Sequence, residues 1–309
     1  MNKENNKKEF VFFCMTYKGY ETLNYILSKE KIRRYIRYVI SEEEKGVQKD
    51  YYEDIKSLCE KYKIEFVYKN KFDYSYLKKD NVFSFCIGWK WIIREASNLI
   101  VIHDSILPKY RGFVPLVNML INNESKIGVT AIKASEEMDK GPIIMQKEVN
   151  ITYPIKIAEA LKLIAPIYSQ IVEEIICKII NDIPFDLLEQ DEKQASYSMW
   201  RDELDYFIDF QWDALKIKRF IDAVGFPYKG SCCYMNEKLV RILDAYVVED
   251  VAIEDRESHV GKVIFFRNGN PVVVCGRRLI CFTDIIDDSN GEKIEGIPFK
   301  TRFTRFKRG

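Results

Sequence analysis

A histidine at the end of an apolar run is the first residue of this chain that could carry out chemistry. The stretch "VIHDSILPKYRG" runs from Val101 to Gly112 and places His103 directly after branched apolar residues. Histidine changes its charge near neutral pH, so its ring can donate or accept a proton during a reaction. The chain holds only two histidines, and a single one can equally end a strand and hydrogen-bond a neighbouring loop. The residue alone leaves both interpretations open.

One acidic residue lies in a short polar connection 36 positions after this histidine. It is Asp139, in "EEMDKG", between two predicted strands. Aspartate is a common turn former, which by itself explains this position. A carboxylate beside a histidine would instead fix the ring, raise its pKa or hold a water that relays protons. The residues around Asp139 leave both interpretations open.

The segments before His103 predict the sheet that would position it. Strands are expected over residues 10–18, 34–41, 64–69, 80–89 and 98–103, with helices over 19–30, 50–63 and 90–97. Strands that are apolar on both faces and alternate with helices indicate a parallel sheet covered on both sides. The fold class expected is α/β, a Rossmann-like open and mostly parallel sheet with helices on both faces. Ligands bind such sheets at the carboxyl ends of the strands, which is where His103 lies.

The remainder of the chain predicts a second, smaller domain. A helix over 113–125, strands over 128–135 and 142–151 and a long helix over 155–182 complete the first domain. A helix over 213–224 then precedes short strands over 231–236, 238–249, 261–270 and 271–285, with a hairpin signal at Asn268-Gly269. This pattern is typical of a small OB-like β-barrel. We expect a catalytic domain over 1–185, a linker over 186–199 and the barrel domain over 200–309.

Composition excludes several classes of protein. Lys and Arg number 48 against 47 Asp and Glu, which gives no electrostatic footprint for a long nucleic acid. The first ten residues are polar, and no apolar run is long enough to cross a membrane, so we expect a cytoplasmic protein. The eight cysteines form no C-x-x-C pair and are expected to be reduced and buried, without a metal site or disulfides. Neither a dinucleotide-binding glycine motif nor a P-loop occurs.

The spacing around His103 resembles one family. The pattern "H-x-S-x-L-P-x-x-R-G-x-x-P", followed by "M-D-x-G-x-I", is similar to the formyltransferases that use N10-formyltetrahydrofolate. The matching residues are His103, Ser105, Leu107, Pro108, Arg111, Gly112 and Pro115, then Gly128, Thr130, Met138, Asp139, Gly141 and Ile143. The resemblance extends to "YFIDFQWDALKIKRFIDAVGFPYKG", which looks like the start of the carboxyl-terminal barrel of that family.

The resemblance implies roles for three positions. The family uses an Asn-x-His pair and an Asp, which correspond here to Val101, His103 and Asp139. In formyl transfer an amine attacks the formyl carbon, so the site needs a donor for the developing oxyanion and a group that handles the proton of the amine. Valine cannot donate, and losing one oxyanion donor typically costs about 10²–10³ in rate. Another donor (His103, a backbone N–H or a water) replaces it, or the chemistry is slow, altered or lost.

The resemblance also implies that N10-formyltetrahydrofolate binds at the strand ends, largely through backbone groups. The corresponding residues are Phe85, Cys86, Ile87, Gly88, Trp89, Ile106, Leu107, Pro108, Met138 and Gly141. Gly88 would let a flat ring approach closely, although a plain turn explains it equally well.

The expected acceptor is a nucleotide-linked amino sugar, as in lipopolysaccharide O-antigen biosynthesis. The basic insertion with which tRNA formyltransferases grip their substrate is replaced by the acidic, aromatic stretch 41–58, so no nucleic acid is expected. Candidate substrate-binding residues are Lys18, Arg111, Tyr197, Trp200 and Arg201. Two alternatives remain: a methionyl-tRNA formyltransferase, and a repurposed relative with weak or no catalysis because of Val101. A homodimer is left open.

Overall fold

The computed structural model describes residues 7–94 and 96–307, which form two compact units. The first comprises the described residues up to Leu116, together with Ser125–Ile151 and Glu159–Met199. The second comprises Val117–Glu124, Thr152–Ala158 and the described residues from Trp200 onward. Each unit is built around its own sheet.

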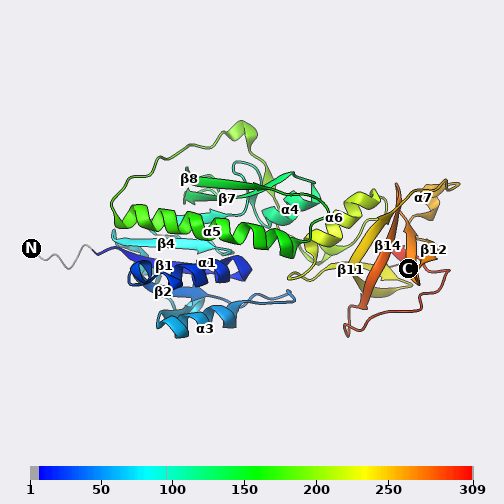
Figure 1. Ribbon diagram of the computed structural model, residues 1–309, viewed down its shortest axis with the longest axis horizontal. Helices are drawn as coiled ribbons and strands as arrows, with labels where there is room; N and C mark the ends of the chain where they lie inside the picture. The colour runs from blue at the N-terminus through cyan, green and yellow to red at the C-terminus, as the bar shows by residue number, and fades with distance from the viewer. Residues whose placement is uncertain (1–6, 95, 308–309) are drawn as a thin grey trace, which may run out of the picture. The chain divides into compact units, whose positions relative to one another are not determined.

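The first unit contains a seven-stranded sheet in the order β3-β2-β1-β4-β5-β7-β8 (Figure 1). The strands are β1 (Glu9–Cys14), β2 (Ile36–Ser41), β3 (Glu65–Tyr68), β4 (Val82–Ile87), β5 (Leu99–His103), β7 (Lys126–Lys133) and β8 (Ile143–Asn150). The first five are parallel to one another, whereas β5 pairs with β7, and β7 with β8, in the antiparallel sense. The predicted open, mostly parallel sheet is therefore confirmed. Strand β5 is an interior strand of this sheet, between β4 and β7.

Helices of different kinds cover the sheet. The α-helices are α1 (Thr16–Ser28), the short α2 (Glu30–Arg33), α3 (Tyr52–Tyr62) and α5 (Ile157–Ile180). Helices α1 and α5 are joined by the hydroxyl of Tyr25, which donates to Glu173 at 2.5 Å. Two 3-10 helices follow β3, η2 (Lys69–Lys71) and η3 (Tyr74–Lys78), and η3 packs on an apolar cluster that includes Val11 and Phe13 of β1. Helix α1 begins at Thr16, so the strand predicted to reach Lys18 ends earlier.

The predicted helix over 90–97 is wrong for its described residues, which are irregular. Ile93 and Ala96 pack with Trp89 against the same apolar cluster of the sheet, while Ile92 is 72% exposed. The apolar residues of this segment therefore anchor an extended connection between β4 and β5. Their spacing resembles that of a helix face, which explains the error.

The second unit is a curled, antiparallel sheet that forms a half-barrel, in agreement with the predicted OB-like domain. Its order is β12-β13-β14-β11-β10-β15. The bounds are β10 (Ser231–Met235), β11 (Lys238–Val248), β12 (Val263–Arg267), β13 (Asn270–Val274), β14 (Leu279–Asp287) and β15 (Phe303–Thr304). A turn separates β13 from β14, where a single strand was expected. Helix α6 (Ala214–Val224) buries Ile217, Phe220 and Ile221, and Asp213 caps its start by accepting from the backbone of Leu215.

Most of the cysteines are buried, as the sequence predicted. All eight cysteines are free, and every one except Cys177 is buried. In the described part of the chain, no helix has the length and hydropathy needed to cross a membrane. The same residues contain no cluster of His, Cys, Asp and Glu that could hold a metal ion.

Candidate active site

His103 closes β5, and its ring is anchored on one side. The residue is 6% exposed, and its Nε2 lies 2.9 Å from the backbone oxygen of Tyr110. A carbonyl oxygen can only accept, so Nε2 must carry a proton and donate it. The other ring nitrogen, Nδ1, is then the only one that can accept a proton.

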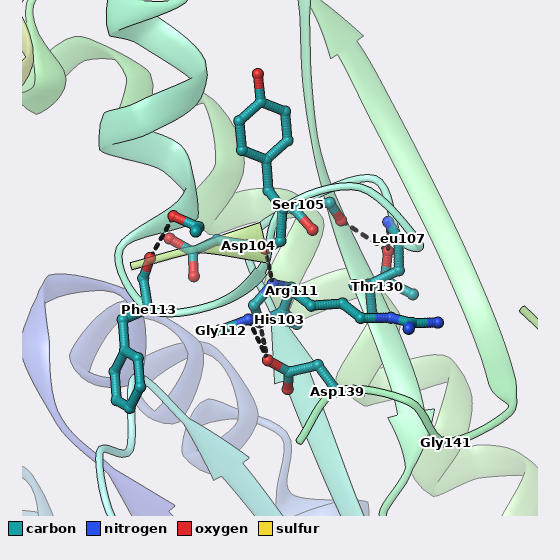
Figure 2. Close-up of polar contacts among 12 residues, drawn as sticks. His103, Asp104, Ser105, Leu107, Arg111, Gly112, Phe113, Thr130, Asp139 and Gly141 are labelled. Carbon is teal, nitrogen blue, oxygen red and sulfur yellow. Dashed lines mark hydrogen bonds and ion pairs between the residues drawn. The ribbon is translucent and has the colours of Figure 1, made fainter. Parts of the chain in front are cut away.

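Asp139 faces this free nitrogen from the connection between β7 and β8 (Figure 2). Its Oδ2 lies 3.6 Å from Nδ1 of His103 and accepts a hydrogen bond from the backbone N–H of Gly112 at 2.7 Å. Asp139 has a φ of +55°, a left-handed conformation that non-glycine residues adopt at a cost. The structure thus brings together the two residues that the sequence pointed to, 36 positions apart.

The geometry of this pair determines what it can do. When His103 is neutral, the lone pair of Nδ1 points towards a negatively charged oxygen, which is unfavourable. A proton taken up at Nδ1 turns that contact into an attraction. The pair can therefore accept a proton from a reacting group and then present an N–H beside the carboxylate. These are the two capabilities that attack by an amine on a carbonyl requires.

The loop after His103 is held by a buried threonine. The hydroxyl of Thr130 donates to the carbonyl of Ser105 at 2.7 Å and accepts from the N–H of Leu107 at 3.2 Å (Figure 2). The side chain of Gln146 donates to both Thr130, at 2.8 Å, and the carbonyl of Leu107, at 2.9 Å. A Cβ on Gly128 would come within 2.7 Å of Ile106, so this position needs glycine. Strands β7 and β8 thereby fix the loop that follows the catalytic candidate.

Lys18, predicted to bind substrate, is engaged elsewhere. It is 6% exposed, and its Nζ donates to Asp104 at 2.7 Å. Burial alone would raise the pKa of Asp104, but the charges of Lys18 and His103, together with the Lys18 hydrogen bond, bring that pKa below its usual value. Asp104 was not singled out from the sequence. Two features of the sequence could have indicated this ion pair. Asp104 directly follows His103, and Lys18 comes shortly after the end of β1.

Arg111, predicted to bind substrate, is held in a network of hydrogen bonds. Its side chain is 0% exposed, and its guanidinium donates to Gln190 at 2.9 and 3.1 Å and to Glu192 at 2.7 and 2.9 Å. These four hydrogen bonds occupy the guanidinium, whereas the side chain of Glu192 is 61% exposed. Both partners belong to the segment expected as a linker, and a role of Arg111 in substrate binding stays a prediction.

The other predicted substrate-binding residues fall in different parts of the fold. Tyr197 is 60% exposed in the first unit, where β9 (Tyr197–Ser198) pairs with β6 (Arg111–Gly112). Trp200 and Arg201 belong to the second unit. The guanidinium of Arg201 donates to Asn118 and to the backbone of Asp205, both in that unit. Their roles in substrate binding stay predictions.

The predicted cofactor residues divide into two groups. Phe85, Cys86 and Ile87 are buried on β4, and their backbone groups are paired with β1 and β5 on either side. Leu107 is also buried, whereas Met138 is 45% exposed on the connection that carries Asp139, and Ile106, Pro108 and Gly141 lie on loops. Along this segment, the backbone groups that could bind a ligand instead of a neighbouring strand begin after Ile87, at Gly88 and Trp89.

The residues that follow β4, beginning with Gly88, say more about a cofactor site than the strand itself. Gly88 has a φ of +64°, and a Cβ there would lie 2.7 Å from the carbonyl of Met15. The close turn alone therefore requires glycine. Among the described residues, the buried indole nitrogen of Trp89 and hydroxyl of Thr16 have no hydrogen-bond partner. Buried polar atoms normally have partners, so these two atoms suit a ligand that supplies them.

Val101 occupies the position expected to hold an oxyanion donor. It packs against Leu107, Ile132 and Ile143, all of them buried and apolar. The valine side chain thus completes an apolar surface next to His103. The side chain of His103 can supply a donor in place of an asparagine. Once Nδ1 has taken up a proton, it can present an N–H to a reacting oxygen.

Comparisons with known proteins agree with this site. Residues 82–162 match the family model described as "Formyl transferase". Residues 202–296 match the model of the formyl transferase C-terminal domain. The chain belongs to the formyltransferase family. The first match contains both His103 and Asp139, and the second covers most of the half-barrel unit.

The chain is similar to curated relatives over part of their length. The methionyl-tRNA formyltransferase of Thermotoga neapolitana is 36% identical over 149 residues, which is 48% of this chain and 47% of that protein. That of Pseudothermotoga lettingae is 30% identical over 52% of this chain and 54% of the relative. The chain thus spans about half the length of the curated relatives it matches.

Three solved structures share the fold at low identity. The sugar 3N-formyl transferase WlaRD, in the presence of dTDP and 5-N-formyl-THF, has a TM-score of 0.65 at 20% identity and covers 89% of this chain and 97% of its own. The N-formyltransferase of Helicobacter canadensis, with folinic acid and dTDP-3-aminofucose, has a TM-score of 0.62 at 18% identity, over 89% and 99%. The methionyl-tRNA formyltransferase of Clostridium thermocellum has a TM-score of 0.58 at 17% identity, over 94% and 100%.

Proposed function

We propose that this protein transfers a formyl group from N10-formyltetrahydrofolate to the amine of a nucleotide-linked amino sugar. The observation that carries the proposal is the His103–Asp139 pair, with Nδ1 and Oδ2 3.6 Å apart at the end of β5. Membership of the formyltransferase family supports the reaction class, because both residues lie within the matched region.

The cofactor assignment is supported by polar atoms that lack partners. The indole nitrogen of Trp89 and the hydroxyl of Thr16 both adjoin Gly88, and neither has a hydrogen-bond partner among the described residues. A pterin carries several ring nitrogens and an oxygen that can pair with such groups. The related structures contain 5-N-formyl-THF, folinic acid or tetrahydrofolic acid, which favours a reduced folate here as well.

The chemistry of the chain's own residues follows from their geometry. When bound, N10-formyltetrahydrofolate supplies the formyl carbon that the amine attacks. Nδ1 of His103 would accept the proton that the attacking amine loses and would pass it to the folate nitrogen N10 as the bond between N10 and the formyl carbon breaks, so that tetrahydrofolate leaves. Nε2 stays bonded to the carbonyl of Tyr110. Asp139 stabilises the resulting positive ring, and the new N–H can donate to the formyl oxygen as that oxygen becomes negative. His103 thereby serves in place of the donor that Val101 cannot provide.

The choice of acceptor depends on charge. Residues 200–309 contain 18 basic and 18 acidic residues, so the half-barrel unit carries no net charge to attract a phosphate backbone. In the segment after β2, Glu42 and Glu44 are ion-paired with Lys69 and Lys90, so the charges of these two lysines are already compensated. A small, nucleotide-linked acceptor fits these features better than tRNA. The two sugar N-formyltransferases that share the fold were solved with dTDP or a dTDP-sugar.

The test is an acceptor screen by mass spectrometry. The protein is mixed with N10-formyltetrahydrofolate and a panel of dTDP-, UDP- and GDP-linked 3- and 4-amino sugars. We expect one of them to gain a single formyl group. No product with any of them, together with no binding of 5-formyltetrahydrofolate by calorimetry, would overturn the proposal.

Methionyl-tRNA is a second candidate acceptor because the curated relatives are methionyl-tRNA formyltransferases at up to 37% identity. Binding of initiator tRNA that weakens steeply as salt rises, with formylation of its methionine, would favour this function. In a repurposed relative without catalysis, the same screens would show folate binding but no product. The three outcomes are distinct.

A further inference from the structure

Residues 186–199, named here the strap, do more than connect two units. The strap runs antiparallel to the edge of β8 at one point, where Leu188 and Ile143 exchange backbone hydrogen bonds at 2.8 and 2.9 Å. It also lies beside both loops of the candidate site. All of these contacts are within the first unit.

The carboxyl-terminal end of the strap holds the loop that anchors His103. Ser196 accepts from the N–H of Arg111 at 2.8 Å through its carbonyl and from the N–H of Tyr110 at 2.9 Å through its hydroxyl. Ser198 accepts from the N–H of Phe113 at 2.8 Å. A Cβ on Gly112 would lie 2.5 Å from the carbonyl of Ser198, so the two segments are in close contact. Tyr110, whose carbonyl fixes Nε2 of His103, therefore sits in a segment bonded to the strap.

The amino-terminal half of the strap holds the loop that carries Asp139. The side-chain amide of Gln190 donates to the carbonyls of Asp139 and Gly141, each at 2.7 Å. Its side-chain oxygen accepts from Arg111 at 2.9 and 3.1 Å. One glutamine thus connects the loop of Asp139 to the loop of Tyr110 through a fully buried arginine.

From these contacts we infer that Gln190 is a positioning residue, which sets the separation of Asp139 from His103 through Arg111. Asp139 is in a left-handed conformation and needs contacts that over-determine it. Gln190 supplies one of them on the backbone of Asp139 and holds the same loop at Gly141, and Gly112 supplies another on the side chain of Asp139. A displacement of about 1 Å in a reacting group can lower a rate about 10²-fold. This inference rests on the proposed function, in which the His103–Asp139 pair performs the chemistry.

A spectroscopic readout tests the inference without any acceptor. The chain has two histidines, so the imidazole ¹⁵N signals of the whole protein come from His103 and His259. We expect Gln190→Ala to move the Nδ1 resonance of His103 while His259, in the second unit, stays unchanged. Gln194→Ala is the matched control, because Gln194 lies in the same stretch and its side chain donates to Asp191.

Kinetics supply the second readout once an acceptor is known. Gln190→Ala should lower kcat about 10–100-fold with KM for the folate changed less than about twofold. Gln190→Glu keeps an acceptor for Arg111 but cannot donate to the two carbonyls, so it should show the same loss. It also carries the test if Gln190→Ala does not fold.

The outcomes separate cleanly. An unmoved His103 signal in both Gln190 variants, or an equal change in Gln194→Ala or at His259, would overturn the inference. A moved His103 signal in a protein that formylates no acceptor would refute the proposed function and leave the positioning role intact.

Discussion

The carbonyl of Tyr110 accepts a hydrogen bond from Nε2 of His103 at 2.9 Å, and this contact decides which ring nitrogen is reactive. With Nε2 committed, Nδ1 is left to face Asp139. The backbone of one loop therefore sets the tautomer of a residue on β5, as the hydrogen bond at one ring nitrogen generally does for the other.

Removing either member of the pair should abolish or severely reduce formyl transfer. We expect His103→Ala to lose about 10²–10⁴ in rate, the usual contribution of a positioned acid–base group. Asp139→Asn should lose about 10²-fold or more, although asparagine can still accept from Gly112. Product formation is followed by mass spectrometry, with His259→Ala, in the second unit, as the control. Unchanged rates in the first two variants would exclude the pair from catalysis.

Restoring the family residue at position 101 should not raise the rate. The valine packs against Leu107, Ile132 and Ile143, so Val101→Asn would place an amide in an apolar cluster and cost about 1–3 kcal/mol of stability. We expect an equal or lower rate and a lower unfolding midpoint in urea. A gain of about 10²-fold would contradict this and identify the native site as one that lacks a donor.

The Lys18–Asp104 pair should make the protein sensitive to acid. Because Lys18 and His103 lower the pKa of Asp104 in the folded state, the pair contributes fully above the unfolded pKa of about 3.9. That contribution is lost as pH falls through the lower, folded pKa. Asp104→Asn should therefore be less stable at pH 7 and should lose less stability below about pH 4 than the parent protein. Urea unfolding between pH 7 and pH 3 measures both.

The control for this pair is an exposed ion pair of the same sheet. Lys126 and Glu148 are ion-paired across β7 and β8 with side chains 49% and 46% exposed. Exposed pairs contribute about 0–1 kcal/mol, so Glu148→Gln should change stability little at pH 7. If Glu148→Gln costs as much as Asp104→Asn, burial is not what makes the Lys18 pair important.

Arg111 should matter for stability whether or not the protein formylates anything. Arg111→Met removes four hydrogen bonds and leaves the partly buried Gln190 without its donor, which should lower the midpoint of urea unfolding. Arg277→Met is the control, because its side chain is 72% exposed. Equal unfolding midpoints for the two variants would show that the strap contributes little to the first unit.

Sequence was a good guide where one strand or one motif contains the information. The apolar run before His103 predicted β5, and the resemblance to the formyltransferases predicted that His103 and Asp139 belong to one site, where the structure brings them together. The alternation of strands and helices predicted the sheet. These features depend on local periodicity and on residues held close to one motif.

Contacts between distant side chains could not be predicted in this way. Arg111 looked like a ligand for phosphate, yet its partners Gln190 and Glu192 lie about 80 positions later in a polar stretch. Nothing in the local pattern tells a buried arginine from an exposed one. The segment 90–97 failed for a related reason, because Ile93 and Ala96 are held by the sheet rather than by helical turns.

The burial of Arg111 also bears on how this chain can be made. Residues 190–192 contain the acceptors of the Arg111 guanidinium. Until they have been synthesised, burial of the guanidinium would leave a charge without a partner, which opposes folding. The loops of the site therefore become complete only after the strap has left the ribosome, although the sheet beneath them can form earlier. A chain cut after residue 185 would stop short of that point.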